Sequence, residues 1–506
     1  MTAMLKTPRR SFLRTGFAGM LSSLGGIQFL SAKEGGKKPG SSGGDDYKAL
    51  VCVYLNGGND SNNLLIPTAT GQTARKLYDA ARGELRIEGD IVELESGLRA
   101  PVGNSDEAVE LGLHPACGEL APLYESGKLA FVCNVGPLLQ PLANLKEYKS
   151  LPKPDYLFSH SDQKRDWHTA LASNAYGASG WGGRLAEATA ACRAYSLNQG
   201  SPYLRGRDGS ALPYTVLAPG ETVGLDKNPF FGGTKLHAPL EKMMELAGGG
   251  KRLRKSRPLE ADYAAAFGVA KERALIVQGA FEGYEAVKGV HPESGEDFQW
   301  DDDVHRAFQN VYGYSAKGAR EIGGLGQQFM AVARLIGRQK DLGESRHIFA
   351  VGAGGYDTHN SQAEIHGELL GELAKALRGF HDALVALDKI DSVVAFTASD
   401  FGRSLLPNAG GGSDHAWGGH SMLLGGPVRG GRAFGSVANY DLSLPDDLSM
   451  TTDARGRFIP GISVSEYCAV LANWFGAKPG EVLNDLFPEL TRFPDPLKNP
   501  KLQLFG

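Results

Sequence analysis

The chain is poor in cysteine and has no excess of basic residues, and each shortage excludes a class of protein. Its five cysteines are spread over 506 residues without a Cys-x-x-Cys pair, so neither a disulfide framework nor a zinc ribbon is expected. Lys and Arg number 53 against 57 Asp and Glu, which argues against a nucleic-acid partner. Cys52 and Cys133 fall inside apolar runs and are expected to be buried.

A long apolar segment is also missing from the N-terminal region. The mildly apolar stretch from Thr15 to Leu30 is interrupted by glycines and is shorter than the roughly 20 residues of a membrane span. Arg9-Arg10, followed by Ser-Phe-Leu, resembles a twin-arginine export signal. Residues 1–32 are therefore expected to be a signal peptide, with the twin-arginine translocase as a partner during export and a periplasmic or secreted location. Residues 33–46 read as a flexible linker.

The sequence does contain short apolar runs, and several of them end in glycine. Five lack polar alternation, at 50–55, 129–135, 348–351, 393–397 and 422–424. Such runs are typical of strands buried on both faces of a parallel sheet. A helical period is clearest from Gln362 to Leu387, where Ser361 and Glu364 suggest a capping box. The expected fold is α/β, a doubly wound, mostly parallel sheet with helices on both faces.

The pattern changes between residues 194 and 303, which are rich in loop-forming residues. This segment holds a basic run at 251–257, expected to be a solvated face, and an acidic loop at 296–303. We therefore expect residues 47–193 and 304–506 to form the core, and residues 194–303 to be a loop-rich insertion or cap.

Clusters of Asp and His follow three of the apolar runs, and a fourth cluster leads into the last run. Open α/β sheets bind ligands at the carboxyl ends of their strands. Mixed Asp and His ligands suit zinc, manganese or iron, and their number is about what two adjacent ions require. Taken singly, each cluster has a simpler interpretation as a turn or a hydrogen-bonded loop pair. The candidate metal ligands are Asp60, Asp357, His359, Asp400, Asp414, His415 and His420.

These motifs resemble domain-of-unknown-function family 1501, an exported family grouped with alkaline phosphatases and sulfatases. The similarity covers roughly residues 48 to 475 and rests on GGND, SHSDQ at 159–163, GGYDTHNSQ at 354–362, SDFGRS at 399–404 and GSDHAWGGH at 412–420. It implies an alkaline-phosphatase-like core, two divalent ions, zinc or manganese, and cleavage of phosphate or sulfate esters of a small molecule or polymer.

The resemblance also implies which residue serves which ion. Asp60 follows the first strand, Asp357 and His359 serve one ion, and Asp400 and His415 serve the other. His420 is a further candidate, and Asp414 with His415 is an alternative to Asp400. The spacing Asp-x-His departs from the Asp-x-x-x-His of the superfamily.

Ser159 is the best candidate for a nucleophile, and Ser61 is the second. Superfamily nucleophiles stand at a helix N-terminus, and Ser159 precedes a helix-like stretch. A serine in that position has a simpler interpretation, which is a helix N-cap. Phe158 stands where the family usually has Arg, and the sulfatase Cys-x-Pro-x-Arg motif is absent from the sequence. Arg403 is expected to clamp a tetrahedral anion, or else to pair with Asp400. The competing hypothesis is a non-catalytic binding or secretion-partner protein of the cell envelope that retains the fold.

Overall fold

The computed structural model describes most of the chain after the expected leader. The described residues are 46–69, 73–103, 107–173, 179–197, 201–207, 213–218, 221–222, 286–290, 297–315, 318–437 and 439–506. The expected signal peptide, all but the last residue of the linker, and the basic run at 251–257 lie outside them. In the described part of the chain, no helix is long and apolar enough to cross a membrane.

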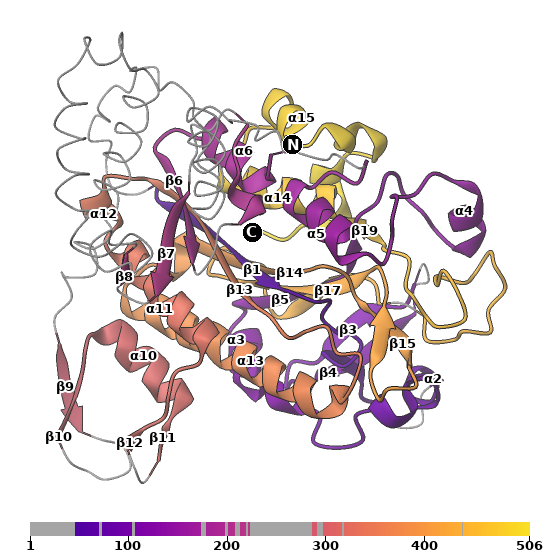
Figure 1. Cartoon of the computed structure of the whole chain (residues 1–506), viewed down its shortest axis with the longest axis horizontal. Coiled ribbons are helices and arrows are strands. Elements are labelled where there is room, and N and C mark those ends of the chain that lie inside the picture. The colour runs from indigo at the N-terminus through magenta and orange to yellow at the C-terminus, as the bar shows by residue number, and fades with distance from the viewer. Residues whose placement is uncertain are drawn as a thin grey trace, which may run out of the picture.

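A mostly parallel sheet forms the centre of the molecule (Figure 1). At its middle lies β1 (Lys48–Leu55), parallel to β13 (Arg346–Ala353) on one side and to β14 (Val393–Ser399) on the other. Beyond β13 the sheet continues in parallel through β6 (Cys192–Leu197) and β7 (Tyr214–Ala218). The expectation of a mostly parallel α/β sheet is confirmed.

The other half of the sheet contains its main antiparallel strand. β17 (Gly419–Leu424) runs against both of its neighbours, β14 and β5 (Leu129–Gly136). β18 (Arg432–Gly435) and β19 (Ile462–Ser463) are again parallel to β5. All five apolar runs of the sequence therefore lie in strands of this one sheet.

Helices cover both faces of the sheet, because side chains along each strand alternate between two cores. On β1, Val51 and Val53 pack into the core beneath α11 (Gly324–Gly337) and α13 (Gln362–Ala386). Cys52 and Tyr54 face the opposite core, which includes α14 (Val464–Phe475). Figure 1 shows α11 and α13 below the sheet and α14 above it. Cys52 and Cys133 are buried and free, as expected.

The capping box expected at the start of α13 is wrong. Ser361 is the N-cap residue, but its φ of 48° is left-handed and its side chain makes no capping hydrogen bond. A capping box occurs instead at α14, where Ser463 and Glu466 satisfy each other's backbone N–H groups.

The segment 194–303 contributes to the core sheet at its start. β6 and β7 pair there, and β8 (Glu221–Thr222) closes that edge. Further along, β9 (Val287–Val290) and β10 (Asp297–Trp300) form a separate antiparallel pair. Most of the segment between them lies outside the described residues, so its role as a cap stays a prediction.

Shorter elements complete the described structure. Small sheets are formed by β2 (Leu65–Pro67), β3 (Leu98–Pro101) and β4 (Ala108–Leu113), by β11 (Tyr314–Ser315) and β12 (Gly318–Ala319), and by β15 (Arg403–Pro407) and β16 (Ser413–His415). Further helices are α2 (Thr73–Arg82), α3 (Ala121–Glu125), α4 (Leu145–Ser150), α5 (His160–Thr169), α6 (Trp181–Ala188), α10 (Asp303–Tyr312), α12 (Gln339–Leu342) and α15 (Glu481–Leu486).

The carboxyl ends of the three central strands meet at one edge of the sheet. Leu55, the last residue of β1, is in register with Ala353 at the end of β13 and with Ser399 at the end of β14. The loops that follow these strands therefore leave the sheet side by side. This register brings polar clusters that are far apart in the sequence into one place.

Candidate metal centre

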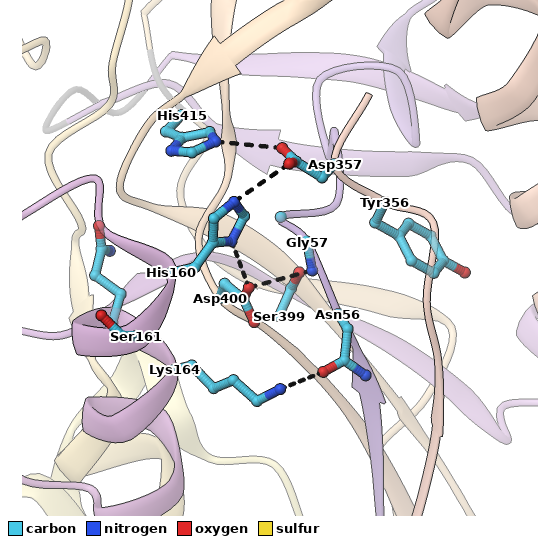
Figure 2. Close-up of polar contacts among 12 residues, drawn as sticks. Asn56, Gly57, His160, Ser161, Lys164, Tyr356, Asp357, Ser399, Asp400 and His415 are labelled. Carbon is cyan, nitrogen blue, oxygen red and sulfur yellow. Dashed lines mark hydrogen bonds and ion pairs between the residues drawn. The ribbon is translucent and has the colours of Figure 1, made fainter. Parts of the chain in front are cut away.

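Four side chains from three parts of the chain converge beyond this edge, and Figure 2 shows three of them, His160, Asp357 and His415. Asp357 and His359 lie in the loop after β13, His160 is the first residue of α5, and His415 ends β16. The ligand atoms of His160, Asp357 and His415 all lie within 4.8 Å of one another. Among the residues that the structure describes, this is the one group of three or more potential ligands at such spacing.

The three imidazoles each present Nε2 to the carboxylate of Asp357. His415 Nε2 lies 3.2 Å and His359 Nε2 3.1 Å from Asp357 Oδ1, and His160 Nε2 lies 3.4 Å from Oδ2. His359 and His415 approach each other to 2.8 Å between their Nε2 atoms. Two lone pairs cannot face each other at this distance, so either a proton or a cation belongs between them.

The Nδ1 atoms of these histidines face oxygen atoms on the far side. His160 Nδ1 is 2.8 Å from Asp400 Oδ2, and His415 Nδ1 is 2.8 Å from the carbonyl oxygen of Phe158. An oxygen acceptor keeps the proton on Nδ1 and leaves the lone pair on Nε2, which is the arrangement that metal-binding histidines require. Burial lowers the pKa of His415 against the opposing effect of the Phe158 carbonyl, which favours the neutral, ligating form.

Gly57 makes the close approach of these loops possible. Its N–H donates to Asp400 Oδ2 at 3.2 Å, so it orients the carboxylate that holds His160. Its φ is 117°, and a Cβ at this position would lie 2.4 Å from the backbone nitrogen of Asp357. Only glycine combines this conformation with this contact.

Arg403 pairs with Asp357 rather than with Asp400. Its side chain is fully buried and contacts Asp357 Oδ1 at 2.5 Å. The guanidinium also donates to the carbonyl oxygens of Gly57, Gly58, Tyr356 and Ser413. We therefore assign Arg403 a positioning role beneath the site.

Asp357 keeps its charge and remains accessible. Burial acts to raise its pKa, but the hydrogen bond and charge of Arg403, together with His359 and His160, lower it overall. Its side chain is 45% exposed, so the carboxylate faces both the histidines and solvent. A ligand set with an open side is the arrangement that catalytic metal sites use.

Asp60 lies outside this group, in contrast to the expectation that it binds a metal. Its carboxylate is fully buried, forms an ion pair with Arg82 and accepts a hydrogen bond from Gln362. Burial acts to raise its pKa, but Arg82 and His366 outweigh that effect and lower it. With both oxygens used inside the protein, Asp60 stabilises the loop after β1.

Three other expected ligands occupy outer positions. Asp400 holds His160 from behind and is 3% exposed. Asp414 Oδ1 lies 3.7 Å from His359 Nδ1, and its other oxygen is 2.8 Å from Arg455. His420 accepts a hydrogen bond at Nδ1 from the N–H of Asn134 and lines a separate small cavity, and burial lowers its pKa to about 4.

The two candidate nucleophiles are placed differently. Ser159 is the N-cap residue of α5, but its side chain makes no capping hydrogen bond. Its hydroxyl donates to Asp162 Oδ2 at 2.6 Å, so it is held by the helix whose first residue is His160. Ser61 is buried, at 3% exposure, in the loop after β1.

Sequence reasoning missed His160 as a ligand candidate. The residue lies within the SHSDQ motif, directly after Ser159, the candidate nucleophile. The available signal was a histidine within this motif, directly before a predicted helix-like stretch. Arg82, which takes Asp60 out of the ligand set, carries no signal of its own in α2.

The fold and the site define an α/β protein with a candidate His/Asp metal centre at the carboxyl edge of a mostly parallel sheet. The chain belongs to the DUF1501 family, described as proteins of unknown function, whose model matches residues 47–447. No curated protein matches the sequence.

Several solved structures share a distant similarity. Ps i-CgsB in complex with k-i-k-neocarrahexaose has a TM-score of 0.33 at 10% identity, covering 88% of this chain and 77% of that one. The PsFucS1 sulfatase from Pseudoalteromonas sp. has a TM-score of 0.25 at 10% identity, covering 86% and 70%. The lipoteichoic acid synthase LtaP from Listeria monocytogenes has a TM-score of 0.26 at 10% identity, covering 77% and 78%. Similarities this weak carry no argument about activity.

Proposed function

We propose that this protein is an exported, metal-dependent hydrolase of phosphate or sulfate esters. The observation that supports the proposal is the approach of three imidazole Nε2 atoms to the carboxylate of Asp357. Three nitrogens and one oxygen suit zinc best and manganese second. We propose one ion in place of the two first expected, held by His160, Asp357, His359 and His415. A divalent ion in this position supplies a Lewis acid for an ester oxygen.

The residues around the centre have separate roles in this proposal. Asp400 and the Phe158 carbonyl orient two of the histidines, and Arg403 fixes Asp357 from below. Ser159 is the proposed nucleophile. Its Oγ forms a bond to phosphorus or sulfur while the bond to the ester oxygen breaks, and its proton passes to Asp162 Oδ2, the acceptor of its hydrogen bond. The departing alkoxide takes a proton from solvent to become the alcohol. Water then attacks the same phosphorus or sulfur, the bond to Oγ breaks, phosphate or sulfate is released, and Asp162 returns the proton to Oγ.

A second candidate is a binding protein that holds a metal without turning over esters. The contacts of Asp162 favour it, because its carboxylate accepts the Ser159 hydroxyl hydrogen bond and also forms an ion pair with Arg165 at 2.8 Å, so the hydroxyl is already held within a structural network.

Ester turnover separates the two candidates. The mature chain, reconstituted with zinc or manganese, is assayed against an aryl phosphate and an aryl sulfate beside His359→Ala and Ser159→Ala. The hydrolase proposal expects turnover by the wild type, loss in His359→Ala with loss of metal, and loss in Ser159→Ala with metal retained. Turnover that persists in Ser159→Ala would move the attack to Ser61 or to water. A metal-loaded wild type that is inactive on both esters would contradict the hydrolase and support the binding protein.

The Ser159 variant is informative because it is expected to fold normally. The side chain makes no helix-capping hydrogen bond, so the usual loss of about 1 kcal/mol for a removed N-cap does not apply. Melting curves on the same preparations check this expectation.

A further inference from the structure

Lys164 lies one helical turn after His160 on α5, and the two residues share a face of the helix. Figure 2 shows the side chain of Lys164 extending from α5 toward Asn56, and that of His160 extending toward Asp357 and Asp400. The ammonium of Lys164 donates to Asn56 Oδ1 at 2.5 Å and lies 5.3 Å from the centre of the Tyr54 ring. The next residue after Asn56 is Gly57, which binds Asp400, so the ammonium lies next to the layer that supports the metal centre.

Lys164 differs from the arginines around the site in having no ion-pair partner among the described residues. Arg403 is paired with Asp357, Arg82 with Asp60, and Arg455 with Asp414. Lys164 forms no ion pair within the described part of the chain, and its one hydrogen bond there goes to a neutral amide.

His168, one turn further along α5, carries no charge that could compensate the ammonium of Lys164. Burial lowers the pKa of His168 to about 3, and the charge of Lys164 acts in the same direction, so His168 is neutral. An ammonium has three hydrogens to donate and acts as a compact point charge toward phosphate-like groups. Among the residues that the structure describes, Lys164 is thus a half-buried positive charge without an ion-pair partner, one helical turn from the ligand candidate His160.

We propose that Lys164 is an anion-binding residue, whose ammonium takes a non-bridging oxygen of a phosphate or sulfate group bound at the His/Asp centre. This inference rests on the proposed function and specifies how the anionic part of the substrate is held. The competing interpretation is structural, in which Lys164 ties α5 to the end of β1 through Asn56.

Anion binding by the zinc-loaded protein tests the inference without any turnover. Inorganic phosphate and sulfate are titrated calorimetrically into the wild type, Lys164→Met and Lys164→Arg. Lys48→Met is the matched control, because Lys48 Nζ also donates to a carbonyl oxygen, at 2.7 Å, and lies over an aromatic ring, at the opposite end of β1. Loss of a charge-assisted hydrogen bond predicts affinity about tenfold weaker or more in Lys164→Met. Lys164→Arg should retain most of the affinity, and Lys48→Met all of it.

The outcomes are distinguishable from those of the proposed function. Wild-type affinity in Lys164→Met overturns the inference and leaves the structural tie, which a lower melting temperature of that variant would show. A zinc-loaded wild type that binds neither anion also overturns it. Anion binding that depends on Lys164 in a protein without ester turnover supports the inference and contradicts the hydrolase alone.

Discussion

His359 Nε2 and His415 Nε2 lie 2.8 Å apart, and both lie within 3.2 Å of the same oxygen of Asp357. The two histidines are 56 residues apart in the sequence. A neutral pair at this separation needs a proton between the rings, and a divalent ion can take the place of that proton. Metal binding at this position should therefore depend on pH.

The first prediction concerns metal content. Wild-type protein reconstituted with zinc should retain about one equivalent per chain, because one ligand group is present among the described residues. His160→Ala and His415→Ala should each lose most of it, as measured by elemental analysis after dialysis. His381→Ala is the control, since that histidine is paired with Asp382 on α13. Two equivalents of zinc in the wild type would support the two-ion expectation. A wild type that retains no zinc would contradict the proposed metal centre.

The second prediction concerns Asp60. Asp60→Asn leaves Arg82 charged and fully buried without its partner, so unfolding in urea should require about 3 kcal/mol less free energy. Zinc content of the folded protein should stay unchanged, because Asp60 lies outside the ligand group. Glu110→Gln breaks an exposed ion pair with Arg99 and should change stability by less than about 1 kcal/mol. Loss of zinc from folded Asp60→Asn would return Asp60 to the ligand set.

The third prediction concerns Asp166, a buried residue of α5. Burial raises its pKa to about 7 in spite of Arg165, and one of its oxygens has no hydrogen-bond partner in the described structure. The folded protein therefore binds more protons than the unfolded chain between about pH 4 and pH 7. The stability that this residue contributes is fully present below about pH 4 and is lost as the pH rises through about 7.

Urea unfolding at pH 5 and pH 8 measures this effect. Between these values the wild type should lose about 3 kcal/mol that Asp166→Asn does not lose, because about two pH units separate pH 5 from the folded pKa of about 7 and each corresponds to 1.36 kcal/mol. Asp391→Asn serves as control, because the side chain of Asp391 is 82% exposed. Equal losses in the wild type and Asp166→Asn would show that Asp166 titrates normally.

The fourth prediction concerns export, which depends on residues outside the described structure. Replacing Arg9 and Arg10 with lysine should keep the protein in the cytoplasm, because lysine does not reproduce the guanidinium pair. Cell fractionation and immunoblotting measure the distribution. Arg14→Lys, a change of the same type outside the pair, should be exported normally. Normal export of the double variant would contradict the twin-arginine signal.

Several features of the fold followed from local patterns. Five apolar runs without polar alternation identified five strands of the central sheet, because a strand buried on both faces tolerates few polar residues. The period of 3.6 identified α13 to within one residue at its end. The helix begins at Gln362 as predicted, but the capping box before it was wrong, because Ser361 adopts a left-handed conformation that the pairing of serine and glutamate does not reveal.

The sequence by itself determined that Asp and His would gather at the carboxyl edge of the sheet, because parallel strands place the loops that follow them together. Only the tertiary structure decided which of them form the centre. Asp60 and Asp357 both follow buried strands and glycine-rich turns, yet Arg82 holds Asp60 inside the protein, while Arg403 holds Asp357 from one side and leaves it 45% exposed. His160 enters because α5 begins beside these loops, and no local spacing encodes that contact. A carboxylate can serve as a metal ligand only where its charge remains accessible. Ion pairs with residues far apart in the chain decide which carboxylates remain so.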